Sequence, residues 1–76
     1  MASEERIVID DRIMGGKPVI AGTRVPVQVI VGALAGGMSR DEICREYRIT
    51  DADIQAALAY AAQALADEKV HAIPRR

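Results

Sequence analysis

A chain of 76 residues is long enough for one small domain, and its formal net charge of −1 is unlike that of a strongly basic nucleic-acid binder. Half of the residues are apolar, but there is no Trp and no Phe, so Ala, Val, Ile and Leu must build the core. A single cysteine excludes an internal disulfide, and no apolar run approaches the ~18 residues of a membrane span. The first six residues do not have the pattern of a signal peptide, so we expect a cytoplasmic protein.

The first 25 residues predict a small β-hairpin or arm. The β-branched run at 6–10 predicts one short strand, and Val19-Ile20 predicts a second. Gly15-Gly16 and Gly22-Thr23 indicate turns around them. Two short strands are marginal in water on their own. We therefore expect them to lie on the helices or to pair with another chain.

The first helix is expected to begin at Pro26 and to end at Gly36-Gly37. An apolar stripe at i, i+3, i+4 and i+7 defines its inner face. The positions in this stripe are Val27, Ile30, Val31 and Leu34.

Two further start signals predict the remaining helices. Ser39 with Glu42 fits a capping box, which opens a short helix that stops near Arg48. Thr50 opens the longest helix, with acidic residues in its first turn, where the helix dipole favours them. The predicted fold is mainly α, with a short N-terminal β-hairpin or arm followed by a three-helix, helix-turn-helix-like bundle. Residues 1–70 form its single domain, and 71–76 form a short basic tail.

The residues that carry chemistry give no credible catalytic set. Cys44 lies within a predicted helix and fits a small buried hydrophobe, and His71 lies far along the chain in the tail. The Cys and His spacings of a structural zinc site are missing. Gly15-Gly16-Lys17 departs from a phosphate-binding loop, because Pro18 follows the lysine where Ser or Thr is needed. We expect no enzyme, no cofactor and no metal.

The basic residues form two candidate binding sets. Arg24 lies in a turn and has the planar fork that suits carboxylates, although it also fits a solvated surface residue. Arg40, Arg45 and Arg48 lie on the first helix of the helix-turn-helix pair and are candidates for DNA phosphates. Acidic residues alternate with them, which favours a solvated face. The second helix has no Lys or Arg between Thr50 and Ala66, which argues against a groove-reading role.

Three motifs make the chain similar to the DUF433 family. They are Gly-Gly-Lys-Pro-Val-Ile from residue 15, Gly-Thr-Arg-Val-Pro-Val from residue 22, and Ala-Leu-Ala-Tyr-Ala from residue 57. The resemblance extends from about Arg6 to Val70. The family-motif residues present are Gly16, Lys17, Pro18, Gly22, Thr23, Arg24 and Pro26. Members commonly have an Asp-Pro type pair after the strand, where this chain has Asp10-Asp11.

The resemblance implies a small helix-turn-helix-like fold and an antitoxin-like function. Such an antitoxin binds and neutralises a PIN-like nuclease of the DUF5615 type, and it can also bind operator DNA. Because PIN-type sites gather carboxylates around a metal ion, the expected partner-binding candidates are basic. They are Lys17, Arg24, Arg75 and Arg76.

Two alternatives stay open at the level of the sequence. One is a DNA-binding transcriptional regulator, and the other is a structural homodimerisation module without a toxin partner. A homodimer is expected under every hypothesis. Its seam would follow the longest helix, through Ile54, Leu58, Ala61 and Leu65.

Overall fold

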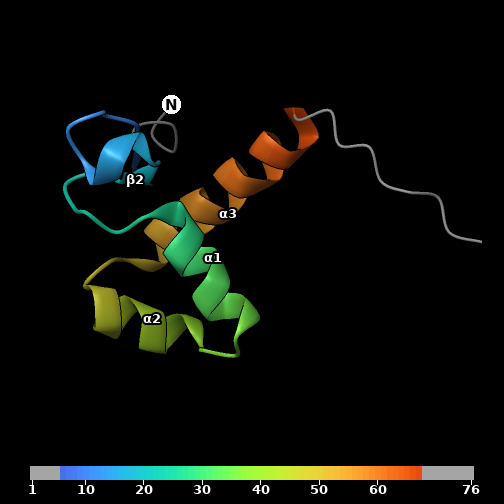
Figure 1. Cartoon of the computed structure of the whole chain (residues 1–76). Coiled ribbons are helices and arrows are strands. Elements are labelled where there is room, and N and C mark those ends of the chain that lie inside the picture. Colours follow the sequence, from blue (N-terminus) through green and yellow to red (C-terminus); the bar gives the residue numbers. More distant parts are fainter. Residues whose placement is uncertain (1–5, 68–76) are drawn as a thin grey trace, which may run out of the picture.

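The computed structural model describes residues 6–67, and it confirms the predicted fold class: a short antiparallel hairpin near the N-terminus followed by three helices. The predicted tail at 71–76 and its two arginines lie outside the described residues. In chain order the elements are β1 (Ile7–Val8), η2 (Met14–Gly16), β2 (Val19–Ile20), α1 (Val27–Ala35), α2 (Arg40–Tyr47) and α3 (Asp51–Asp67). Figure 1 shows α1 at the centre, α2 below it, the N-terminal segment above its start, and the far end of α3 projecting away.

Residues 6–26, here called the arm, contain a first strand shorter than the sequence predicted and a second strand at the predicted position. β1 pairs antiparallel with β2 through Ile7 with Ile20 and Val8 with Val19. β1 ends at Val8, because Asp10 turns the chain: its carboxylate accepts the Arg12 backbone N–H at 2.9 Å, and its carbonyl accepts that of Ile13 at 2.8 Å. A side chain that bonds its own backbone two residues on competes with the strand ladder.

Helix α1 begins and ends close to the predicted positions. Pro26 is the N-cap, with φ −70° and extended backbone, and the N–H of Val27 donates back to the Pro18 carbonyl at 2.9 Å. At the other end Gly37 has φ +102°, its N–H donates to Leu34, and the N–H of Met38 donates to Ala33, both at 3.0 Å. These two bonds form a Schellman motif, which requires a residue with positive φ at Gly37.

Helices α2 and α3 both begin with a reciprocal cap. The predicted Ser39–Glu42 capping box is confirmed: the Glu42 N–H donates to the Ser39 hydroxyl at 3.1 Å, and Glu42 Oε1 accepts the Ser39 N–H at 2.8 Å. Thr50 and Asp53 repeat this arrangement at 3.1 and 3.0 Å. Between the helices Arg48 turns the chain with φ +58°.

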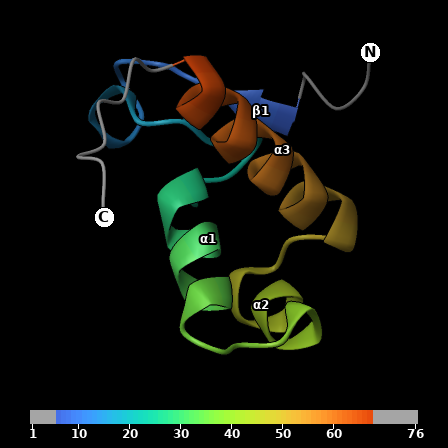
Figure 2. The same ribbon diagram turned by 90° about the vertical axis from the view of Figure 1, so that its right-hand side faces the viewer.

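The core joins the arm to the helices. Isoleucines from β2, α1, α2 and α3 are almost fully buried, and Ala57 lets α3 approach them. Figure 2 shows β1 beside α3, which agrees with the contacts between these two elements. The core cluster consists of Ile20, Val27, Ile30, Ile43, Ile49, Ile54 and Ala57. Across residues 6–67 no helix has the length and apolar character needed to cross a membrane.

Candidate partner-binding surfaces

Arg24 lies on a turn whose backbone is fixed by hydrogen bonds. The Thr23 N–H and hydroxyl both donate to the Ile20 carbonyl, at 3.0 and 2.8 Å, and the Thr23 hydroxyl accepts the Val25 N–H at 2.9 Å. Gly22 supplies φ +78° at the third position of this turn, as a type II turn requires. The Arg24 side chain is exposed, and the ion pairs within residues 6–67 use Arg6, Arg12 and Arg40 instead. The motif therefore builds a rigid turn that presents one cation to solvent.

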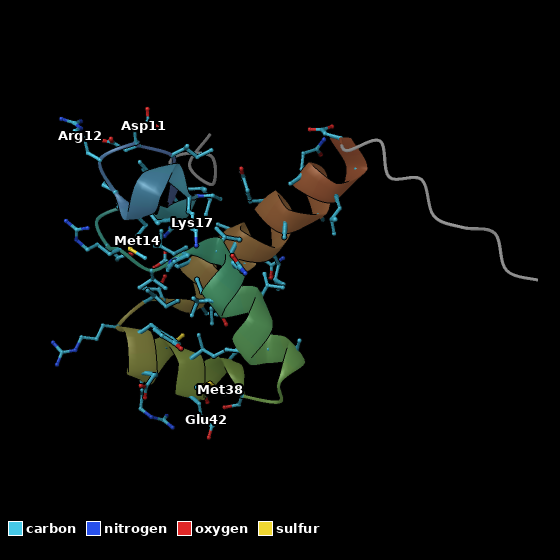
Figure 3. All side chains as sticks on the ribbon, in the orientation of Figure 1. Asp11, Arg12, Met14, Lys17, Met38 and Glu42 are labelled. Carbon is cyan, nitrogen blue, oxygen red and sulfur yellow. The ribbon has the colours of Figure 1, made fainter. Side chains whose placement is uncertain are left out.

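Lys17, the other described partner-binding candidate, lies at an apolar groove of about 650 Å³. The groove lies between α1, the far half of α3 and the Lys17-Pro18 segment of the arm. Figure 3 shows Lys17 near the start of α1, whereas Asp11 and Arg12 lie at the outer edge of the arm. Lys17 is the charged member of an otherwise largely apolar lining that includes Val27, Val31, Ala61, Ala64 and Leu65. The sequence did not predict this groove.

The three arginines proposed for DNA binding have different environments. Arg40 is engaged within the chain: Nε and Nη2 donate to the two carboxylate oxygens of Asp51 at 2.6 and 3.0 Å. The hydrogen bond from Arg40 lowers the pKa of Asp51, and the same bond raises the pKa of Arg40. Arg45 and Arg48 are exposed. Of the three, Arg45 and Arg48 are therefore the exposed arginines that make no ion pair within residues 6–67.

Asp53, the second acidic residue at the start of α3, also makes an ion pair with a residue of another element, Arg6 of the arm. Asp53 accepts Arg6 Nη1 at 2.9 Å, in addition to its bonds with Thr50. Desolvation raises the pKa of Asp53, but hydrogen bonds from the Thr50 backbone and from Arg6 outweigh it, so the pKa lies below its ordinary value. The acidic start of α3 thus serves to cap the helix and to attach α2 and the arm to it.

The residues of the predicted dimer seam lie partly in the core and partly on the surface. Ile54 is 0% exposed in the core of the single chain, so it is not available at the surface between two copies. Leu58 and Ala61 are half-buried, and Leu65 is 64% exposed. The apolar stripe is continuous, as predicted, but its N-terminal part packs within the chain.

The residues weighed for chemistry form no metal-binding cluster within residues 6–67. Cys44 is half-buried on α2, and His71 lies outside the described residues. Within 6–67 no group of three or more His, Cys, Asp or Glu side chains is arranged to hold a metal ion. The Gly15-Gly16 segment forms a left-handed turn, and a Cβ on Gly16 would lie 3.1 Å from the Asp11 carboxylate.

Sequence reasoning missed the two ion pairs that hold the start of α3. Arg40–Asp51 spans 11 residues and Arg6–Asp53 spans 47, so neither has the i, i+4 spacing that marks a pair within one helix. The Thr50-x-x-Asp53 pattern was a usable signal for the second reciprocal cap, since Thr has the same capping hydroxyl as Ser and Asp differs from Glu by a shorter acidic side chain.

The hairpin, the three capped helices and the exposed turn define a small helical domain with a helix-turn-helix-like pair, and comparison with known proteins gives its family. The model of the family described as "Protein of unknown function (DUF433)" matches residues 7–61, so the chain belongs to the DUF433 family. An uncharacterized protein from Archaeoglobus fulgidus is 59% identical over 27 residues, which are 36% of this chain and 75% of that protein.

Two crystal structures have a similar fold. A DUF433 member from Anabaena variabilis matches with a TM-score of 0.74 and 31% identity, over 79% of this chain and 60% of that one. Rv2018 from Mycobacterium tuberculosis matches with a TM-score of 0.65 and 29% identity, over 72% of this chain and 26% of that one. The chain thus spans less than two thirds of either solved protein.

Proposed function

We propose that this protein is an antitoxin-like binding module, without catalysis of its own, that neutralises a PIN-like nuclease of the DUF5615 type in the cytoplasm. The observation that supports this most is the exposed Arg24 on its fixed turn. A type II turn, two hydrogen bonds of the Thr23 hydroxyl and the bridge between Val19 and Pro26 all fix the backbone beside it. Such a turn presents a guanidinium with little loss of backbone entropy on binding.

The chemistry of the partner site matches a guanidinium. Carboxylates that hold a divalent metal ion in a PIN-type site are also acceptors for a bidentate arginine. A lysine has the charge but not the planar pair of donors, so it is a poorer substitute. Lys17 is a second exposed cation of the same motif, and Arg75 and Arg76 remain candidates outside the described residues.

Co-expression with the product of the adjacent gene tests the proposal. The wild-type chain is expected to co-purify with that product and to suppress its nuclease activity. Arg24→Ala should weaken the complex about thirtyfold or more, because loss of one partner of a buried charge pair costs on the order of 2–5 kcal/mol. Arg24→Lys should retain part of the affinity.

Arg45→Ala provides the matched control. Arg45 is an exposed arginine on α2, outside the arm, and its loss should leave the complex and the inhibition unchanged. A complex that tolerates Arg24→Ala as well as Arg45→Ala would remove Arg24 from the interface. No complex with the adjacent product would refute the antitoxin proposal itself.

Operator DNA binding is a second candidate function. It is favoured by the exposure of Arg45 and Arg48 and by the engagement of Asp51 and Asp53 with arginines, which reduces their repulsion of phosphates. A gel shift with the upstream promoter fragment should weaken steeply with salt. Here Arg45→Ala should weaken binding and Arg24→Ala should not, the reverse of the nuclease assay. Absence of any shift at low salt would exclude this function.

A further inference from the structure

The apolar stripe of α3 is longer than the domain that covers it. Ile54 and Ala57 are completely buried, Ala61 is half-buried, and Leu65 on the same face is 64% exposed. Leu65 is the most exposed of the large hydrophobic residues in the described part of the chain. Figure 1 shows why: the last turns of α3 project beyond α1 and α2. Most of this large aliphatic side chain is therefore left uncovered by residues 6–67.

The apolar groove lies directly beside this side chain. Its lining includes Leu65 itself, its small neighbour Ala64, Ala61 one turn back, and Val27 and Val31 from α1. The small residues allow a second helix to approach α3 closely, and the valines provide an apolar wall. A protruding leucine and the recess that can receive one thus lie side by side on one face of the same chain.

We propose that a second copy of this chain covers the groove, with α3 packed antiparallel against its symmetry mate and each Leu65 inserted into the groove of the other. A two-fold interface uses the same patch twice, so the patch must be self-complementary. A protrusion next to a matching recess meets this requirement, whereas a groove alone would not. The proposal does not depend on the antitoxin function, since Arg24 is outside the groove lining.

The charges around the groove are consistent with this arrangement. Asp67, which follows Leu65 by two residues on α3, is exposed and carries a carboxylate. Lys17 is the charged residue of the groove lining. Because Asp67 follows Leu65 by two residues, insertion of Leu65 carries the Asp67 carboxylate toward the Lys17 ammonium of the other copy. The symmetric contact therefore gives each exposed cation an anionic partner.

Sedimentation of the full chain over a range of micromolar concentrations tests the proposal, and Leu65→Glu is the decisive variant. The wild type is expected to sediment as a dimer. Burial of one leucine strengthens the dimerisation constant by a factor of about ten or more. Because the two-fold contact buries two copies of Leu65, Leu65→Glu should raise the dimer dissociation constant about a hundredfold or more. Ile9→Glu is the matched control, because Ile9 is 59% exposed and lies outside the groove. It should leave the dimer intact.

A mixed dimer of isotope-labelled and unlabelled chains locates the contact. Isotope-filtered spectra should show Leu65 methyl protons of one chain near Val31 and Ala64 of the other. A wild-type monomer at all these concentrations would overturn the proposal, as would a dimer that Leu65→Glu leaves intact. Contacts of Leu65 with its own chain in place of the intermolecular ones would overturn it as well. Far-UV circular dichroism shows whether Leu65→Glu remains folded, and Leu65→Ala should weaken the dimer in the same direction.

Discussion

The arginines of this chain show how far a residue type predicts a role. Arg40, Arg45 and Arg48 were equivalent in the sequence, but Arg40 makes a bidentate pair with Asp51, whereas the other two are exposed. Arg6 had no assigned role, yet it reaches Asp53 at the start of α3. The cap residues around these arginines were predictable from local spacing. The partners were not, because they depend on where the arm and α2 pack.

Asp53→Asn is expected to reduce stability at neutral pH and to have less effect in acid. The hydrogen bonds to Asp53 lower its pKa below the ordinary 3.8, so the folded chain holds the charged form. The stability from this charge is complete above 3.8 and is lost as the pH falls through the lower, folded value. Asparagine still accepts the cap hydrogen bond but has no charge for Arg6. The expected loss at neutral pH is about 1 kcal/mol.

Urea unfolding of both proteins, at neutral pH and at a pH well below 3.8, measures this difference. The two unfolding free energies should converge in acid. Asp41→Asn is the control, because Asp41 lies in the first turn of α2 and is exposed. It should change stability by less than ~1 kcal/mol, the scale of a helix-dipole contribution. A constant difference between wild type and Asp53→Asn at both pH values would contradict the assigned role of the charge.

At the scale of elements, the helix ends were the most predictable features. The capping box at Ser39, the glycine pair after α1 and the start at Thr50 each involve residues within a few positions, so the sequence alone contains the interaction. The strands were less predictable. β1 stops at Val8 because the Asp10 side chain bonds the backbone of Arg12, and this competes with an otherwise favourable β-branched run.

Gly37→Ala and Gly36→Ala should have clearly different effects although the residues are adjacent. Gly37 has φ +102°, which an L side chain rarely adopts, so alanine there should cost roughly 1–2 kcal/mol. Gly36 is in the right-handed region, and an added Cβ would be 3.4 Å from the Gly32 carbonyl, an ordinary contact. Its replacement should be nearly neutral. Thermal unfolding of the two variants distinguishes them, and equal losses would mean that the Schellman motif does not determine the end of α1.

At the scale of the whole molecule, the composition predicted a core of small aliphatic residues and the periodicity predicted which helix faces form it. The outcome for Ile54 shows the limit of this reasoning. The same stripe that packs α3 into its own domain also continues to Leu65, and periodicity cannot tell where the covering elements stop. The apolar groove depends on that endpoint and on the position of Lys17, which is set by the pairing of β1 with β2. Neither the end of the covering elements nor the position of Lys17 can be predicted from the spacing of residues along the chain.

The arm and the helices should unfold as one unit, and Ile20→Ala tests this. Ile20 belongs to β2 but is 1% exposed within the helical core, so its truncation leaves a cavity among α1, α2 and α3. The expected loss is about 2–5 kcal/mol, a large share of the stability of a small domain. Ile9→Ala, at a position that is 59% exposed, should cost far less. Urea unfolding of Ile20→Ala followed by helical circular dichroism and by amide signals of the arm should give one lowered midpoint. Helices that keep the wild-type midpoint while the arm unfolds would show that the arm is an independent element attached to the bundle.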